Sequence, residues 1–219
     1  MTHKNLLALA VVSLVSLTSQ TAAQGDRWAR AMERFEAADQ EAAPAKGGVV
    51  FTGSSSARMW DLEKSFPGMG YVNRGFGGSQ VSDAIKHIET LVLKHEPRLV
   101  VLYSGDNDVA GGKAAQTVFR DVKDFASKIH AALPQTKIAV IAVKPSIARW
   151  DKIKTIRKAN SLIREFAMET DYLGFVDIDG AMQGWDGKPN PAFFVRDGLH
   201  LSPEGYEVWS AVLKPFLVK

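Results

Sequence analysis

The chain has 219 residues with a formal net charge of +3, and 46% of its residues are hydrophobic. This composition is typical of a folded domain with a full core, and the absence of a basic run argues against nucleic acid as the main partner. There is no cysteine, which excludes disulfides, thiolate metal sites and a cysteine nucleophile.

The first segment is predicted to be a secretory signal peptide, residues 1–23. His3 and Lys4 precede an apolar stretch at 6–17, and small residues lead to Ala23. A basic start, a short apolar middle and a small-residue cleavage point define such signals. The stretch is shorter than the about 20 apolar residues that span a bilayer. We therefore expect cleavage near Ala23, a secreted or periplasmic protein without stable membrane insertion, and one domain over residues 24–219; an uncleaved anchor is the alternative.

Short apolar runs alternate with amphipathic stretches along the rest of the chain. A helix is expected over 28–35, and further helices over 81–92, 118–133 and 153–166, where apolar residues recur every three or four positions. A last helix should begin at Pro203 with Ser202 as its N-cap. The expected strands are 49–51, 71–73, 99–103, 138–143 and 175–176. This alternation predicts an α/β fold, a three-layer α/β/α sandwich around a central five-stranded parallel sheet.

Polar and glycine-rich segments follow the strands, at the edge of the sheet where such folds bind ligands. Among them are the serines 54–56 and the loop that contains His200. A serine nucleophile needs a histidine base, and the base needs a carboxylate that holds its tautomer. Asp197 precedes His200 by three residues, so one turn can bring the carboxylate to the ring. Asp177 and Asp179 remain alternative partners.

Each of these segments also has an ordinary structural explanation. A serine cluster after a strand can be a turn or a helix cap, and the glycines at 75–78 can form a tight turn. The carboxylates at 106–108 can bind a cation or form an Asx turn. Asp197 and His200 can be a structural pair or two metal ligands. Their joint occurrence, at strand ends and before the last helix, favours catalysis.

Four short segments resemble the signature blocks of the SGNH hydrolases, the GDSL esterase/lipase superfamily. They are Gly53-Ser54-Ser55, Gly78 after Asn73-x-Gly75, Gly105-x-Asn107-Asp108, and Asp197-x-x-His200. The resemblance covers residues 48 to 215. It implies a flavodoxin-like sandwich and acyl transfer from an ester to water, with neither a metal nor an organic cofactor.

The resemblance also assigns roles to individual residues. Ser55 matches the nucleophile, His200 the general base and Asp197 its orienting carboxylate. The oxyanion donors would be the N–H groups of Ser55 and Gly78 and the side-chain amide of Asn107. The sequence departs from the family pattern where Ser54 replaces its aspartate, which makes the choice among serines 54, 55 and 56 less secure.

Specificity is read from arginine and aromatic residues near the expected site. Arg58, Trp150 and Phe194 are candidate substrate-binding residues, although aromatic residues here can equally fill the core. Nothing resembles a long apolar lid, so we expect a short acyl group such as acetyl, carried by a small molecule or a polysaccharide. A non-catalytic carbohydrate-binding domain and an acyltransferase are the alternatives, and the sequence does not predict the oligomeric state.

Overall fold

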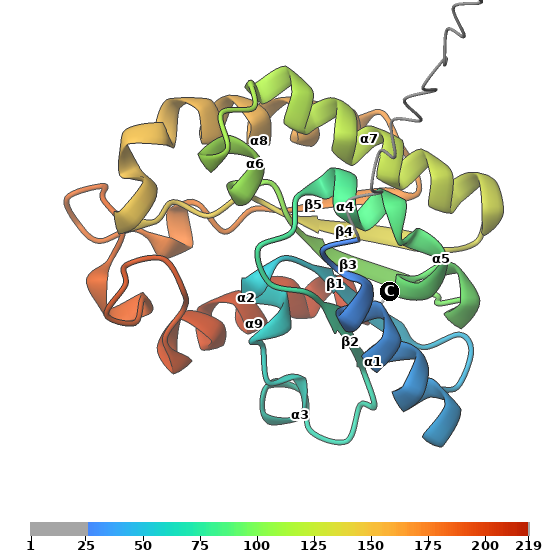
Figure 1. Cartoon of the computed structure of the whole chain (residues 1–219). Coiled ribbons are helices and arrows are strands. Elements are labelled where there is room, and N and C mark those ends of the chain that lie inside the picture. Colours follow the sequence, from blue (N-terminus) through green and yellow to red (C-terminus); the bar gives the residue numbers. More distant parts are fainter. Residues whose placement is uncertain (1–25, 219) are drawn as a thin grey trace, which may run out of the picture.

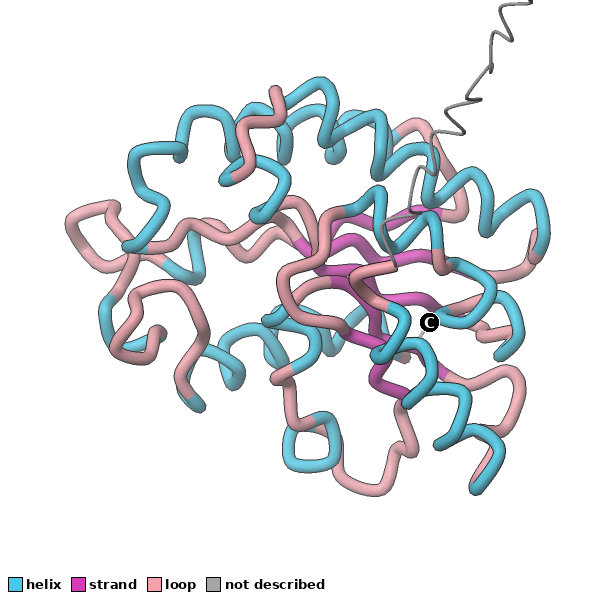
Figure 2. The backbone as a smooth tube through the Cα atoms, viewed as in Figure 1, coloured by secondary structure: helices cyan, strands magenta, loops and turns pink. Residues whose placement is uncertain are grey.

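Five parallel strands form the centre of the molecule in the computed structural model, which describes residues 26–218 (Figures 1 and 2). The spatial order is β2-β1-β3-β4-β5. The strands are β1 (Val49–Gly53), β2 (Val72–Gly75), β3 (Leu99–Tyr103), β4 (Lys137–Ile141) and β5 (Leu173–Val176). This is the flavodoxin-like order, and it confirms the predicted sandwich.

Helices cover both faces of this sheet and give the three layers visible in Figure 1. One face packs against α1 (Ala29–Glu41), α4 (Val81–Lys86), α5 (Ile88–Leu91), α7 (Ala115–Ala132) and α8 (Ile153–Met168). The other packs against α2 (Ser55–Arg58), α3 (Leu62–Ser65) and α9 (Pro203–Leu217). The short α6 (Asp106–Ala110) follows β3, and 3₁₀ turns lie at Leu93–His95, Ile147–Lys152, Gly180–Met182 and Pro191–Phe193.

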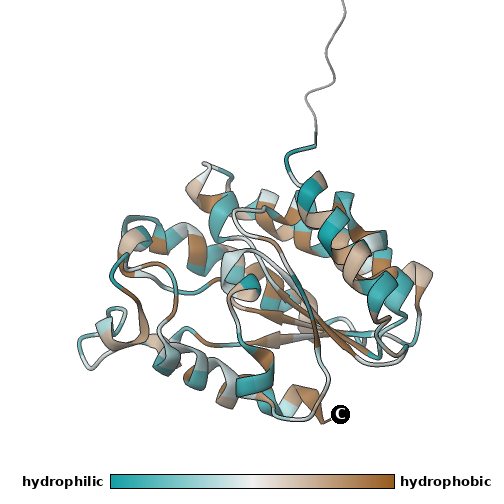
Figure 3. Ribbon diagram, turned by 60° about the horizontal axis from the view of Figure 1, so that its bottom comes forward, coloured by the Kyte–Doolittle hydropathy of each residue, from teal (hydrophilic) through white to brown (hydrophobic). Residues whose placement is uncertain are grey.

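The central strands are buried on both faces because helices cover them on each side. In β3, Leu99, Val101 and Tyr103 face the α9 layer, whereas Val100 and Leu102 face the α7 layer. All five are at most 4% exposed. The hydropathy colouring in Figure 3 shows the same apolar strands between more polar helices. The continuous apolar runs of the sequence thus form strands that helices cover on both faces of the sheet.

Two expected elements end earlier than their patterns. The predicted helix 81–92 is split, because His87 leaves helical geometry (φ −106°, ψ 19°); its ring lies beside Asp26 and against the edge of Phe76. The fourth strand ends at Ile141 and not at Val143, whose N–H and C=O are both bonded by the Asn160 side chain. The last helix begins as predicted, with the Ser202 hydroxyl accepting from the Gly205 N–H.

The expected signal peptide lies outside the described residues. Of the helices within residues 26–218, none combines the length and the apolar character required to cross a bilayer.

Candidate active site

The site lies where the strand order places β1 beside β3. The connection after β1 leads to β2 on one side of this junction, and the connection after β3 leads to β4 on the other side. A crevice therefore opens at the carboxyl ends of β1 and β3. A glycine with positive φ lies at the end of each strand: Gly53 is the last residue of β1 (φ +123°), and Gly105 follows the end of β3 by two residues (φ +117°). A Cβ on Gly53 would lie 1.9 Å from the Tyr103 carbonyl oxygen. Only glycine therefore allows the chain to turn here and begin α2 at Ser55.

Three of the predicted residues form one hydrogen-bonded chain. The Ser55 Oγ lies 2.9 Å from His200 Nε2, and His200 Nδ1 lies 2.6 Å from Asp197 Oδ2. The other carboxylate oxygen, Asp197 Oδ1, accepts from the N–H groups of Leu199 and His200 at 2.8 and 2.9 Å. The three-residue spacing thus holds the carboxylate in one orientation, against one nitrogen of the ring.

The Asp197 carboxylate is ionised over most of the pH range. Its slight burial opposes ionisation, but the hydrogen bonds from the His200 ring and from two backbone N–H groups outweigh it and lower the pKa of Asp197 to about 2. The alternative acids are occupied elsewhere, since Asp177 pairs with Arg164 and Asp179 with Arg157.

The three adjacent serines have different environments. Ser54 is fully buried at the N-cap of α2, and its Oγ has no hydrogen-bond partner among the described residues. Ser56 is also buried, and its Oγ accepts from Lys144 Nζ at 3.1 Å. Ser55 alone of the three contacts the histidine and lines the surface pocket. The geometry therefore favours Ser55 despite the altered motif.

That pocket has a volume of about 570 Å³ and also brings in the expected oxyanion donors, Gly78 and Asn107. Asn107 Nδ2 donates to the Ser79 carbonyl at 3.0 Å, and Asn107 Oδ1 accepts from Arg149 at 3.0 Å. These two contacts fix which end of the amide is the donor. Since an amide nitrogen has two protons, one remains for a ligand.

A buried charged cluster supports this asparagine from below. Lys144 is completely buried and donates to Tyr103 Oη at 2.8 Å and Asp106 Oδ2 at 3.0 Å. Arg149 pairs with Asp106 Oδ1 at 3.0 Å and also holds Asn107. Burial opposes ionisation of Asp106, but the two cations lower its pKa.

The two carboxylates at 106–108, which could also have bound a cation, each pair with a cationic side chain: Asp106 with Lys144 and Arg149, and Asp108 with Lys113. No cluster of three possible metal ligands occurs in residues 26–218.

The three candidate substrate-binding residues lie in three different places. Arg58 lines the pocket beside Ser55. Trp150 lines a separate hollow together with the exposed Trp185. The expectation for Phe194 needs correction, because this residue is 7% exposed and belongs to the hydrophobic core that includes Trp209 of α9. An aromatic residue in the loop before the histidine thus serves packing.

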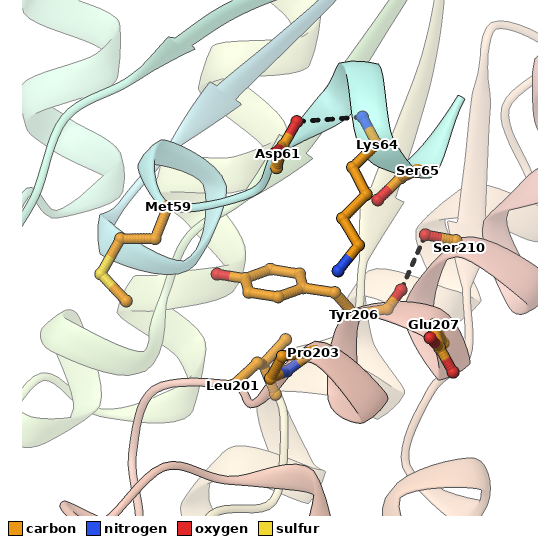
Figure 4. A pocket seen from close by; sticks show the side chains of 9 residues that line it. All are labelled: Met59, Asp61, Lys64, Ser65, Leu201, Pro203, Tyr206, Glu207 and Ser210. Atoms are coloured by element: carbon orange, nitrogen blue, oxygen red, sulfur yellow. Dashed lines mark hydrogen bonds between the residues drawn. The ribbon is translucent and has the colours of Figure 1, made fainter. Parts of the chain in front are cut away.

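A further hollow beside α3 and α9 contains neither Ser55 nor His200. Figure 4 shows the Tyr206 ring in its middle, between Met59 and Lys64. The Tyr206 hydroxyl donates to the Ser56 carbonyl at 2.9 Å, so this contact stabilises the turn that carries the serines.

The sequence analysis did not find the buried charged cluster around Lys144, nor the arginines at and before α1. Lys144 had one signal, because it directly follows the apolar run 138–143. Arg30 and Arg34 are four residues apart, which puts them on one side of α1, and Arg27 lies in the turn just before this helix. They line the pocket that contains Ser55.

The hydrogen-bonded serine, histidine and aspartate lie between the end of β1 and the loop before α9, and serine hydrolases of several folds use such an arrangement. Residues 16–208 match the model of the GDSL-like Lipase/Acylhydrolase family, and the chain belongs to this family.

Solved structures show the same fold. A GDSL-like lipase from Bacteroides thetaiotaomicron is 25% identical with a TM-score of 0.75, over 85% of this chain and 97% of that one. A Streptococcus pneumonia protein named for platelet activating factor is 19% identical with a TM-score of 0.78, over 86% and 92%. A Geobacillus acetyl-xylooligosaccharide esterase is 18% identical with a TM-score of 0.62, over 80% and 95%. No curated protein sequence matches the chain.

Proposed function

We propose that this protein is an exported serine esterase that hydrolyses acetyl or other short-chain esters. The observation that carries the proposal is the continuous chain from Ser55 through His200 to Asp197, with contacts of 2.9 and 2.6 Å. Membership of the GDSL-like family supports a hydrolase.

In the proposed reaction, Ser55 Oγ attacks the ester carbonyl while His200 Nε2 takes its proton. Asp197 holds the ring in the tautomer that can accept this proton and stabilises the resulting imidazolium. The proton then passes to the departing alkoxide, which leaves as the alcohol. Water, deprotonated by the same histidine, attacks the acyl-enzyme. The histidine then gives this proton to Ser55 Oγ as the bond between the serine and the acyl group breaks, which releases the carboxylic acid and restores the free serine.

The oxyanion of each tetrahedral intermediate would be bound by the N–H groups of Ser55 and Gly78 and by Asn107 Nδ2. As the first residue of α2, Ser55 has an N–H without a partner inside its helix. Removing one such donor typically costs about 10²–10³ in rate.

The substrate class is supported by two observations. The fold is shared with an acetyl-xylooligosaccharide esterase, and the pocket at Ser55 combines four arginines with the aromatic residues Trp28 and Phe76. The predicted signal peptide would bring the enzyme to polysaccharides outside the cytoplasm. An acetyl ester of a carbohydrate is therefore the proposed substrate.

The test is the loss of activity in Ser55→Ala with Ser54→Ala as the matched control. Both serines lie at the start of α2, Ser54 as its N-cap and Ser55 as its first residue, but the Ser54 hydroxyl is buried and has no hydrogen-bond partner within residues 26–218. We expect Ser55→Ala to lower kcat for 4-nitrophenyl acetate by at least about 10³-fold and to abolish labelling by a fluorophosphonate, with Ser54→Ala near the wild type. Equal losses in both variants, or labelling of another residue, would contradict the proposal.

A further inference from the structure

The pocket that contains Ser55 is lined by four arginines: Arg27, Arg30, Arg34 and Arg58. They come from α1, from the turn before it and from α2. Two of them lie against the glycine stretch that leads to Gly78. A Cβ on Gly77 would be 3.0 Å from Arg58 Nε, and a Cβ on Gly78 would be 3.5 Å from an Arg27 guanidinium nitrogen.

These arginines have no carboxylate partner in the part of the chain that the structure describes, and no acidic residue lines their pocket. All four are exposed. Several other arginines are neutralised by carboxylates: Arg74 pairs with Asp39, Arg149 with Asp106 and Arg157 with Asp179. The pocket instead gathers four arginines without such a partner around one hollow.

The positive charges of this arrangement repel one another when no anion is bound. Arg30 and Arg34 are four residues apart on α1, and like charges at this spacing destabilise a helix. Arg27 lies over the Trp28 ring, 4.6 Å from its centroid, which restricts the plane of the guanidinium. A fixed guanidinium fork binds a carboxylate or a phosphate in a bidentate manner.

We propose that the substrate of this esterase carries a carboxylate or phosphate group on its alcohol portion, close to the scissile bond. This inference rests on the proposed function. An acetyl group contains no ionisable group, so the anionic group must be part of the alcohol that leaves. A pocket lined by one sign of charge concentrates the field and raises the encounter rate of an oppositely charged substrate.

The test compares three aryl acetates: 4-acetoxybenzoate, 4-acetoxyphenyl phosphate and the neutral methyl 4-acetoxybenzoate. Each enzymatic rate is divided by the rate of hydroxide-catalysed hydrolysis, which removes differences in leaving-group reactivity. At low salt, we expect kcat/KM for at least one anionic ester to exceed that of the neutral ester by about 10-fold or more. The advantage should fall as the salt concentration rises. The better of the two anions identifies carboxylate or phosphate as the group recognised.

Charge reversal then locates the effect. Arg30→Glu combined with Arg34→Glu should lower the ratio of anionic to neutral kcat/KM at least 10-fold. Arg120→Glu, on the exposed side of α7 and away from the pocket, should keep the wild-type ratio. Far-ultraviolet circular dichroism checks that the double variant is folded.

The two proposals fail in different ways. Hydrolysis of the neutral and both anionic esters at equal normalised rates would overturn the anionic substrate and leave the esterase intact. A wild type that hydrolyses none of the three, nor 4-nitrophenyl acetate, would overturn the proposed function.

Discussion

The buried cluster beneath Asn107 makes a quantitative prediction about stability. Two cations, Lys144 and Arg149, share one carboxylate, that of Asp106. Asp106→Asn keeps the shape of the side chain but leaves Lys144, whose side chain is 0% exposed, without its contacting carboxylate. Lys144→Met leaves the Asp106–Arg149 pair in place. The two substitutions therefore remove partners of the same contact with unequal consequences.

We expect Asp106→Asn to lower the free energy of unfolding by about 3–5 kcal/mol, the usual cost of an uncompensated buried charge. For a domain of this size, about 3 kcal/mol corresponds to a fall in Tm of roughly 6–12 °C. Lys144→Met should cost clearly less. The double variant should be more stable than Asp106→Asn alone, because the unpaired ammonium is gone.

The loss should also depend on pH. Burial lowers the pKa of Lys144, and Asp106 is the strongest opposing influence. Removing Asp106 should lower this pKa further. Between that pKa and the ordinary value of 10.5, the unfolded chain then binds more protons than the folded one, so stability rises with pH. Urea unfolding at about pH 7 and pH 9.5 measures this; a deficit below about 1 kcal/mol at pH 7, or one that grows with pH, would refute the reasoning.

Two further predictions concern the active-site turn and the orienting acid. Gly53→Ala should lower the free energy of unfolding, measured in urea, by at least about 3 kcal/mol, because its Cβ would lie 1.9 Å from the Tyr103 oxygen at a φ of +123°. The control Gly180→Ala has open space around the new Cβ and should change this free energy little. Similar losses in both variants would contradict the prediction. Asp197→Asn should lower kcat by about 10⁴-fold at pH 7, because the asparagine favours the wrong tautomer of the imidazole. The pKa of Asp197 is lowered from 3.8 to about 2 in the folded protein. The contribution of this carboxylate to wild-type stability should therefore be present above about pH 4 and be lost as the pH falls through 2. An acid limb of stability unchanged by this substitution would count against that assignment.

Much of the fold was readable because its signals are local. Apolar runs such as 99–103 form strands buried on both faces, and the Ser202–Pro203 pair starts α9 as expected. The family blocks named Ser55, Asp197 and His200 as candidates, since a short motif fixes its own spacing. Where the prediction failed, at His87 and Val143, contacts with distant residues ended the element.

The amino-acid sequence alone determined the order of strands and helices, the parallel sheet and the candidate residues, because periodicity, caps and motifs act over a few positions. Only the tertiary structure decided that Phe194 packs in the core and that Ser56 accepts a hydrogen bond from Lys144. It also decided that the arginines of α1 line the pocket that contains Ser55. These outcomes depend on which faces of distant segments meet across the sheet. No local pattern specifies that meeting, because it is set by the packing of the whole chain.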